Sequence, residues 1–305
     1  MVRETLDSMT AISTIAGHIF GAPVAAAPAR PTVIEARRGT TVDVPELVGY
    51  RDLLWLLALR DIQVRYKQTA LGAAWAVLQP LAMMVVFTFV FGRFMNIAAR
   101  VDVPYPIFAY AGLLPWTFFA ASVNGSSNSL VANAALLRKV YFPRLIMPLA
   151  ALGAPLVDYT VALVVLGGLM AYFHVALTWQ LLLLPVLVGS AIIAALAVGL
   201  LLSALTVSYR DLRHVTPFLL QVWLFVTPVI YPLPIAPRYA GSVDVAHLAM
   251  NLNPMAGTIS AFRAAVLGTP IDGSAWCVSL GVSLLILAGA LKLFAANERR
   301  FADVV

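Results

Sequence analysis

Long apolar stretches recur through most of this sequence, and they constrain its fold more than any other feature. A bilayer core is about 30 Å thick, and a helix of about 20 apolar residues crosses it. Charged residues make up only 11% of the 305-residue chain, whereas soluble domains carry about 25%. The pattern predicts an all-α integral membrane protein with six transmembrane helices. The six stretches cover about residues 71–91, 107–132, 145–173, 181–206, 215–232 and 275–296.

The second stretch is interrupted by a polar block, NGSSNS, at residues 124–129. Small polar side chains stay in a membrane helix when neighbouring helices satisfy their hydrogen bonds. We therefore expect one long helix here, because two half-spans would also disrupt the charge pattern along the chain.

The distribution of the 20 Lys and Arg residues predicts the orientation of the chain. Eleven lie in the segment 51–67, between stretches two and three, between stretches four and five, or after the sixth, and four (Arg93, Arg100, Arg238 and Arg263) lie on the opposite side. The other five are Lys292, near the end of the sixth stretch, and four in the N-terminal segment. Basic residues concentrate on the cytoplasmic side of a membrane protein, so both termini are expected in the cytoplasm. The net charge of +6 is then a topology signal and does not indicate nucleic acid binding.

The segments outside the apolar stretches predict further elements. The N-terminal segment has mixed composition and is expected to be a disordered cytoplasmic tail. A signal peptide is rejected, because its cleavage would place the next basic cluster outside. The segment 233–273 contains Asn253-Pro254 and predicts external re-entrant or gate helices. The expected parts are a tail at 1–42, an amphipathic interface helix at 43–70, a transmembrane domain at 71–298 and a second tail at 299–305.

Few residues offer reactive chemistry. Cys277 is the single cysteine, and its apolar surroundings predict an inert, packed thiol. No paired acids or clustered ligands indicate a catalytic or metal site, so we expect neither. Asp158 is the one acid well inside an apolar stretch, and such a carboxylate is a functional candidate by default. It is expected to be protonated, hydrogen-bonded across helices, or exposed to a lumen.

Six motifs, in this order, indicate a family. They are RDIQVRYKQTALGAAWAVLQP at 60–80, AGLLPWTFF at 111–119, LLRKVYFPR at 136–144, SYRDLRHV at 208–215, TPVIYP at 227–232 and NLNP at 251–254. Over residues 46–300 the chain resembles the permease subunits of type-2 ABC exporters for polysaccharides and polyol phosphates, which export O-antigen, capsule or teichoic acid.

The resemblance implies a homodimeric channel in the bacterial inner membrane that binds two copies of a separate ABC ATPase and moves a lipid-linked glycan. The sequence has no Walker A motif, so ATP and Mg²⁺ are expected on the partner and no cofactor on this chain. The implied ATPase-coupling residues are Arg60, Asp61, Arg65, Tyr66, Lys67, Arg138, Lys139, Tyr141, Phe142, Arg144, Arg210 and Asp211, with Tyr141 and Phe142 as anchors. Asn253 and Pro254 fall in the implied exit gate.

A path for a glycan needs aromatic platforms for the apolar faces of sugars and hydrogen-bonding side chains for their hydroxyls. The candidates along the apolar stretches are Trp75, Gln79, Phe87, Phe91, Trp116, Phe119, Asn124, Asn128, Gln221, Trp223 and Phe225. Ordinary helix packing or lipid contact is the alternative interpretation of the aromatic residues. Buried or lipid-facing amides are costly, which favours a functional role for the polar members.

Other functions stay open at this point. A type-2 ABC permease for teichoic acid, a drug or a simple lipid would share the fold. A membrane glycosyltransferase or lipid-phosphate transferase would need clustered acids or histidines at a membrane face. A proton-coupled transporter would need more buried acids than Asp158 alone.

Overall fold

The computed structural model describes residues 44–67, 74–95, 103–232 and 252–297, all within the compact unit Thr40–Val305. The expected tails at 1–42 and 299–305, and residues 233–251 of the predicted external segment, lie outside the described residues. The described part is helical, and it contains no strand.

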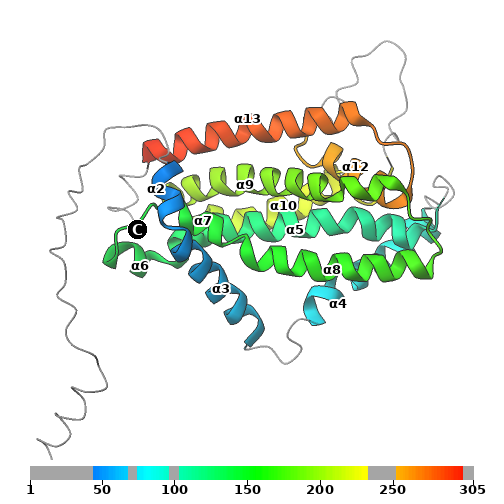
Figure 1. The fold of residues 1–305 in the computed structure, drawn as a ribbon, viewed down its shortest axis with the longest axis horizontal. Helices are drawn as coiled ribbons and strands as arrows, with labels where there is room; N and C mark the ends of the chain where they lie inside the picture. Colours follow the sequence, from blue (N-terminus) through cyan, green and yellow to red (C-terminus); the bar gives the residue numbers. More distant parts are fainter. Residues whose placement is uncertain (1–43, 68–73, 96–102, 233–251, 298–305) are drawn as a thin grey trace, which may run out of the picture. The chain divides into compact units, whose positions relative to one another are not determined.

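Figure 1 shows the described helices in their order along the chain. The first part contains α2 (Val44–Gly49), α3 (Arg51–Lys67), α4 (Ala74–Phe87), the π-helix η1 (Thr88–Phe94), α5 (Tyr105–Ala132) and α6 (Ala134–Lys139). The second part contains α7 (Ile146–Ala150), α8 (Gly153–Tyr172), the 3-10 helix η3 (Trp179–Leu183), α9 (Leu184–Ser208), α10 (Leu212–Val226), α12 (Ala256–Leu267) and α13 (Gly273–Asn297).

Five helical segments among the described residues are long and apolar enough to cross a membrane. They are Ala74–Phe94, Tyr105–Ala132, Ile146–Tyr172, Trp179–Ser208 and Gly273–Asn297. Each overlaps a predicted span, and the polar block at 124–129 lies within the single helix α5, as expected. The remaining prediction, 215–232, falls on α10, whose 15 residues extend about 22 Å at 1.5 Å per residue, less than a bilayer core.

The polar residues of α5 let helices approach closely. The helix packs along both α8 and α9, and Ser126 lies where a Cβ on Gly199 would meet its side chain at 2.8 Å. The Ser126 hydroxyl donates to the Pro148 carbonyl at 2.9 Å. Small side chains that hydrogen-bond across helices are the usual solution for membrane helix packing, so the polar block is part of the core.

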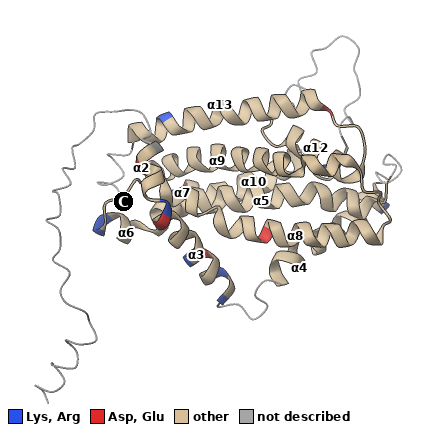
Figure 2. Cartoon of the chain, viewed as in Figure 1, with Lys and Arg blue, Asp and Glu red and all other residues tan. Residues whose placement is uncertain are grey.

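Helix α3 confirms a helix at the predicted interface segment, but its apolar residues do not form one stripe. Leu57 and Ala58 are buried, whereas Trp55 and Leu56 are both 63% exposed. The buried side packs against α7 and α8, where a Cβ on Gly153 would lie 2.9 Å from the Ala58 Cβ. Charged residues gather along α3 and α6, whereas most of the long helices are drawn without charge (Figure 2).

The described part of the predicted external segment is α12, which is buried between other helices. Almost all of its side chains are buried, and it packs against α13, α5 and α9. It ends at Gly268, whose φ of 70° is a left-handed conformation that favours glycine. Asp272 then caps α13 by accepting hydrogen bonds from the amides of Ser274 and Ala275, both at 3.1 Å. Its hydrogen bonds with the Ser274 hydroxyl and the Ala275 amide hold the pKa of this carboxyl below its usual range.

Glycine 257 provides a test of the α12–α13 contact. A Cβ at Gly257 would collide with the Ala275 carbonyl, so Gly257→Ala is expected to destabilise the protein by about 1–3 kcal/mol. Gly281→Ala is the matched control in α13, because nothing lies within 4 Å of its added Cβ. Thermal unfolding in detergent should show a lower midpoint for Gly257→Ala and an unchanged or higher one for Gly281→Ala; equal midpoints would contradict the packing described.

Candidate functional site

The end of α3 is joined to α8 by a charged cluster. Arg65 Nη2 lies 2.6 Å from Asp158 Oδ2, and the Tyr66 hydroxyl donates to Asp158 Oδ1. Only 17% of the Asp158 side chain is exposed. A carboxylate inside an apolar helix needs a partner of this kind. Of the three states expected for Asp158, the structure therefore shows hydrogen bonding across helices, together with an ion pair that the sequence did not predict.

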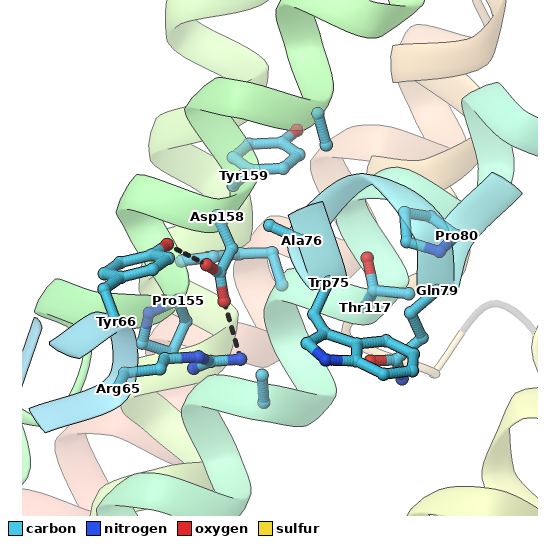
Figure 3. Close-up of a pocket in the computed structure, with 13 residues that line it drawn as sticks. Arg65, Tyr66, Trp75, Ala76, Gln79, Pro80, Thr117, Pro155, Asp158 and Tyr159 are labelled. Atoms are coloured by element: carbon cyan, nitrogen blue, oxygen red, sulfur yellow. Dashed lines mark hydrogen bonds and ion pairs between the residues drawn. The ribbon is translucent and has the colours of Figure 1, made fainter. Parts of the chain in front are cut away.

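The protonation of Tyr66 suits its role as a donor. Burial raises the pKa of Tyr66 to about 12, and the hydrogen bond to Asp158 acts in the same direction. The phenol is therefore protonated near neutral pH, and the carboxylate can accept from it. Within the chain, Arg65 and Tyr66 turn toward Asp158 on α8 (Figure 3), and their predicted contact with a partner ATPase stays a prediction.

A pocket of about 240 Å³ adjoins this cluster, between α3, α4, α5 and α8. Arg65, Tyr66 and Asp158 line one side, and Trp75 and Gln79 lie across from them (Figure 3). Thr117, Pro155 and Tyr159 complete much of the lining. The pocket therefore combines an indole, an amide and a paired guanidinium, which suits a polar ligand with an apolar face.

A second polar contact ties α3 to the end of α5. Arg60 donates to Asp61 Oδ1 through Nε at 3.1 Å and through Nη2 at 2.9 Å. Its Nη2 also donates to Asn133 Oδ1 at 2.9 Å. Because Asn133 follows the last turn of α5, this contact and the Asp158 cluster attach α3 to two different parts of the bundle.

The other predicted coupling residues lie at the same end of the bundle, but they do not share one orientation. Exposed members are Lys67, Arg138, Lys139, Tyr141, Arg210 and Asp211, and Arg144 is half-buried. Phe142 is only 4% exposed and packs in an apolar cluster with Leu145 and Leu57, whereas Tyr141 is 62% exposed. Of the two expected anchors, only Tyr141 therefore has a side chain exposed on the surface of the chain.

The structure also divides the predicted path residues. Trp75, Gln79, Gln221 and Phe225 are exposed, whereas Phe87, Trp116 and Phe119 are buried and Phe91 and Trp223 are partly buried. Trp116 and Phe119 pack against Trp223, with ring centroids 6.2 and 5.4 Å away. Asn124 and Asn128 bond to each other within α5. The exposed members are all on α4 and α10.

The motifs at the far end of the bundle meet one another. Asn253 is buried, and its amide donates to the Thr227 hydroxyl at 2.9 Å; Pro254 is buried beside it. Arg263, which the sequence placed among the opposite-side charges, is 6% exposed. It donates to the carbonyls of Pro228 at 2.8 Å and Val229 at 2.6 Å. A single basic residue in the apolar run AFRAAVL was the signal for this site.

The described residues contain no group of three or more His, Cys, Asp or Glu that could hold a metal ion. Cys277 is exposed on α13, so the expectation of a packed thiol is wrong for the isolated chain. A neutral thiol is apolar enough for an exposed position on a membrane helix.

The five long apolar helical segments in the described part of the chain define a multi-pass membrane protein. Residues 52–267 match the model of the ABC-2 type transporter family. The chain therefore belongs to the ABC-2 type transporter family, whose permeases are transporter subunits that work with ABC ATPase partners.

Relatives with assigned names cover most of the chain. The O-antigen export system permease protein RfbA of Myxococcus xanthus is 33% identical over 86% of this chain and 98% of its own length. The protein of the same name from Klebsiella pneumoniae is 26% identical over 85% of this chain and 97% of its own length. The polysialic acid transport protein KpsM of Escherichia coli is 28% identical over 76% of this chain and 85% of its own length.

The adjacent aromatic residues Tyr141 and Phe142 are expected to contribute very differently to the stability of the protein. Phe142→Ala is expected to lower the free energy of unfolding by about 3–5 kcal/mol, because it leaves a cavity in a packed cluster. Tyr141→Ala should change it by less than about 0.5 kcal/mol, as for most surface substitutions. Unfolding midpoints in detergent measure both effects. A larger loss of stability from Tyr141→Ala than from Phe142→Ala would contradict the burial described for these two side chains.

Proposed function

We propose that the chain is the channel-forming subunit of an ATP-driven exporter that moves a lipid-linked polysaccharide, O-antigen-like in type, from the cytoplasm across the inner membrane. One observation carries the substrate class: the similarity to the Myxococcus O-antigen permease extends over 98% of that protein. The substrate path and the contact surface for the motor are thus both within the compared region.

The proposed topology has six spans with both termini in the cytoplasm. Helix α10 is then the fifth span, and the turn held by Arg263 completes its crossing together with the buried helix α12. This arrangement is favoured by the eleven-to-four distribution of basic residues. It places α3, α6 and the α9–α10 turn on the cytoplasmic side and α12 toward the exit.

Two copies of the chain are proposed to enclose the path. Only 11% of the most apolar part of Ala74–Phe94 is buried within one chain, and α10 exposes Phe218, Val222 and Phe225. Gln79 and Gln221 are also exposed on these helices. Amides that face lipid are costly, so these faces suit a second copy and a polar channel. Trp75 and Gln79 would then contact the sugar chain beside the pocket.

Energy is proposed to come from two copies of a separate ATPase that binds ATP and Mg²⁺. The exposed basic residues of α6, with Tyr141 beside them, would form the main docking surface. Basic residues set the register of such a contact, and an aromatic side chain supplies its buried anchor. Teichoic acid, a drug or a simple lipid as substrate, and a membrane transferase, are the competing functions.

Depletion of the chain in its source bacterium tests the substrate class. The surface polysaccharide should disappear and its lipid-linked precursor should accumulate inside, because synthesis continues while export stops. Immunoblotting of the surface glycan and extraction of lipid-linked sugars measure this. Unchanged surface glycan with loss of export of a small solute would favour the drug or lipid permease, and loss of precursor synthesis would favour the transferase.

Tyr141→Ala tests the motor contact. We expect the substitution to reduce co-purification of the ATPase by about tenfold, as for a hot-spot residue contributing about 1.4 kcal/mol or more. Tyr172→Ala is the matched control, since Tyr172 is 76% exposed at the other end of α8. Equal ATPase recovery from both variants would exclude Tyr141 from the docking surface.

A further inference from the structure

Asp158 stands apart from the predicted coupling and path residues, because neither set included it. We propose that Asp158 is a positioning residue that fastens the end of α3 to α8, so that the two helices move as one body when the ATPase moves α3. The inference rests on the proposed function only for the identity of the motor and the cargo. The attachment itself is a property of this chain.

The contact between α3 and α8 has two points. Ala58 meets Gly153 at the start of α8, and seven residues later Arg65 meets Asp158, five residues further along α8. At 1.5 Å per residue these points lie about 10 Å apart on α3 and about 7 Å apart on α8. Two separated points resist both sliding and tilting. A displacement of α3 is therefore passed to α8 and is not absorbed between them.

Both oxygens of the Asp158 carboxylate are engaged. Oδ1 accepts from Tyr66 and Oδ2 pairs with Arg65 at 2.6 Å. The two contacts that the structure shows for this carboxylate are therefore both to α3, as a role in holding the two helices together requires.

The same cluster forms one wall of the 240 Å³ pocket. Trp75 and Gln79 on α4 form the facing wall (Figure 3). Motion of α3 and α8 as a unit would change the distance between these walls. The attachment thus links α3, on the proposed cytoplasmic side, to the residues proposed to touch the sugar chain.

The test uses the full permease–ATPase complex in membrane vesicles. Asp158→Asn removes the ion pair but keeps an oxygen that can accept from Tyr66. We expect transport per ATP hydrolysed to fall at least about fivefold, while the ATPase rate and the KM for ATP change less than about twofold. Normal transport by this variant would overturn the proposal.

A covalent substitute for the ion pair distinguishes positioning from direct contact. Ala58→Cys and Gly153→Cys are introduced together in a Cys277→Ser background. A Cβ on Gly153 would lie 2.9 Å from the Ala58 Cβ, closer than the roughly 3.5–4.5 Å of a disulfide, so the helices must separate by about 1 Å for the cross-link to form. The reduced double-cysteine chain with Asp158 intact is the control for that displacement. Oxidation should restore transport to the Asp158→Asn chain, and the same sample under reducing conditions is the matched control. A disulfide that forms without restoring transport would show that Asp158 acts on the substrate directly and would overturn the inference.

The disulfide also provides a measurement that needs no substrate. With Asp158 intact, the cross-link should form about threefold faster or more than in the Asp158→Asn chain, because the helices are held in register. If the wild-type complex moves no glycan but this difference is found, the proposed function fails and the attachment stands. Equal rates would overturn the attachment itself. Should Asp158→Asn fail to fold, Tyr66→Phe takes its place, because it removes one of the two contacts with Asp158. Transport, the cross-linking rate and rescue by the disulfide are then measured on that variant, and the same results support or overturn the proposal.

Discussion

The absence of water around an apolar helix bundle is the constraint on which this structure depends. A polar group in hydrocarbon must find its hydrogen-bonding partner within the protein. In this chain a hydroxyl, a carboxylate and a guanidinium group each have such a partner. The Ser126 hydroxyl bonds to a backbone carbonyl of another segment. Asp158 is neutralised by Arg65 on α3, and Arg263 is held by backbone carbonyls beyond α10. These contacts fix helices that apolar packing alone would leave free to slide.

The polar contacts also divide the bundle into regions with different roles. At one end, Arg60 and Arg65 tie α3 to α5 and α8. At the other, Asn253 and Arg263 join α12 to the turn that follows α10. Helices α4 and α10 are left with exposed apolar faces. In the proposed exporter these regions become the motor contact, the exit and the dimeric channel, so one set of hydrogen bonds would hold both ends while the channel helices rearrange.

Much of the fold was predictable because a membrane span depends on the length and composition of one continuous stretch of sequence. Length, hydropathy and small polar residues predicted α5, the combined segment of α7 and α8, α9 and α13 to within a few residues. Helix α10 was harder: the apolar run to residue 232 continues beyond the helix, which ends at Val226 where the chain turns and its carbonyls bond to Arg263. The candidate site was only partly predictable, since Tyr141 and Phe142 have similar composition and adjacent positions but opposite burial.

By itself the sequence determined a multi-pass helical membrane chain, its segment boundaries and its family, because these depend on residue type and order along short stretches. Tertiary structure alone decided which side chains meet. Arg65 and Asp158 are 93 positions apart, and no local pattern indicates that the end of α3 lies against α8. The same holds for Arg263 and the carbonyls of Pro228 and Val229. Such contacts follow from how the helices pack, and packing depends on the shapes of surfaces that distant segments make together.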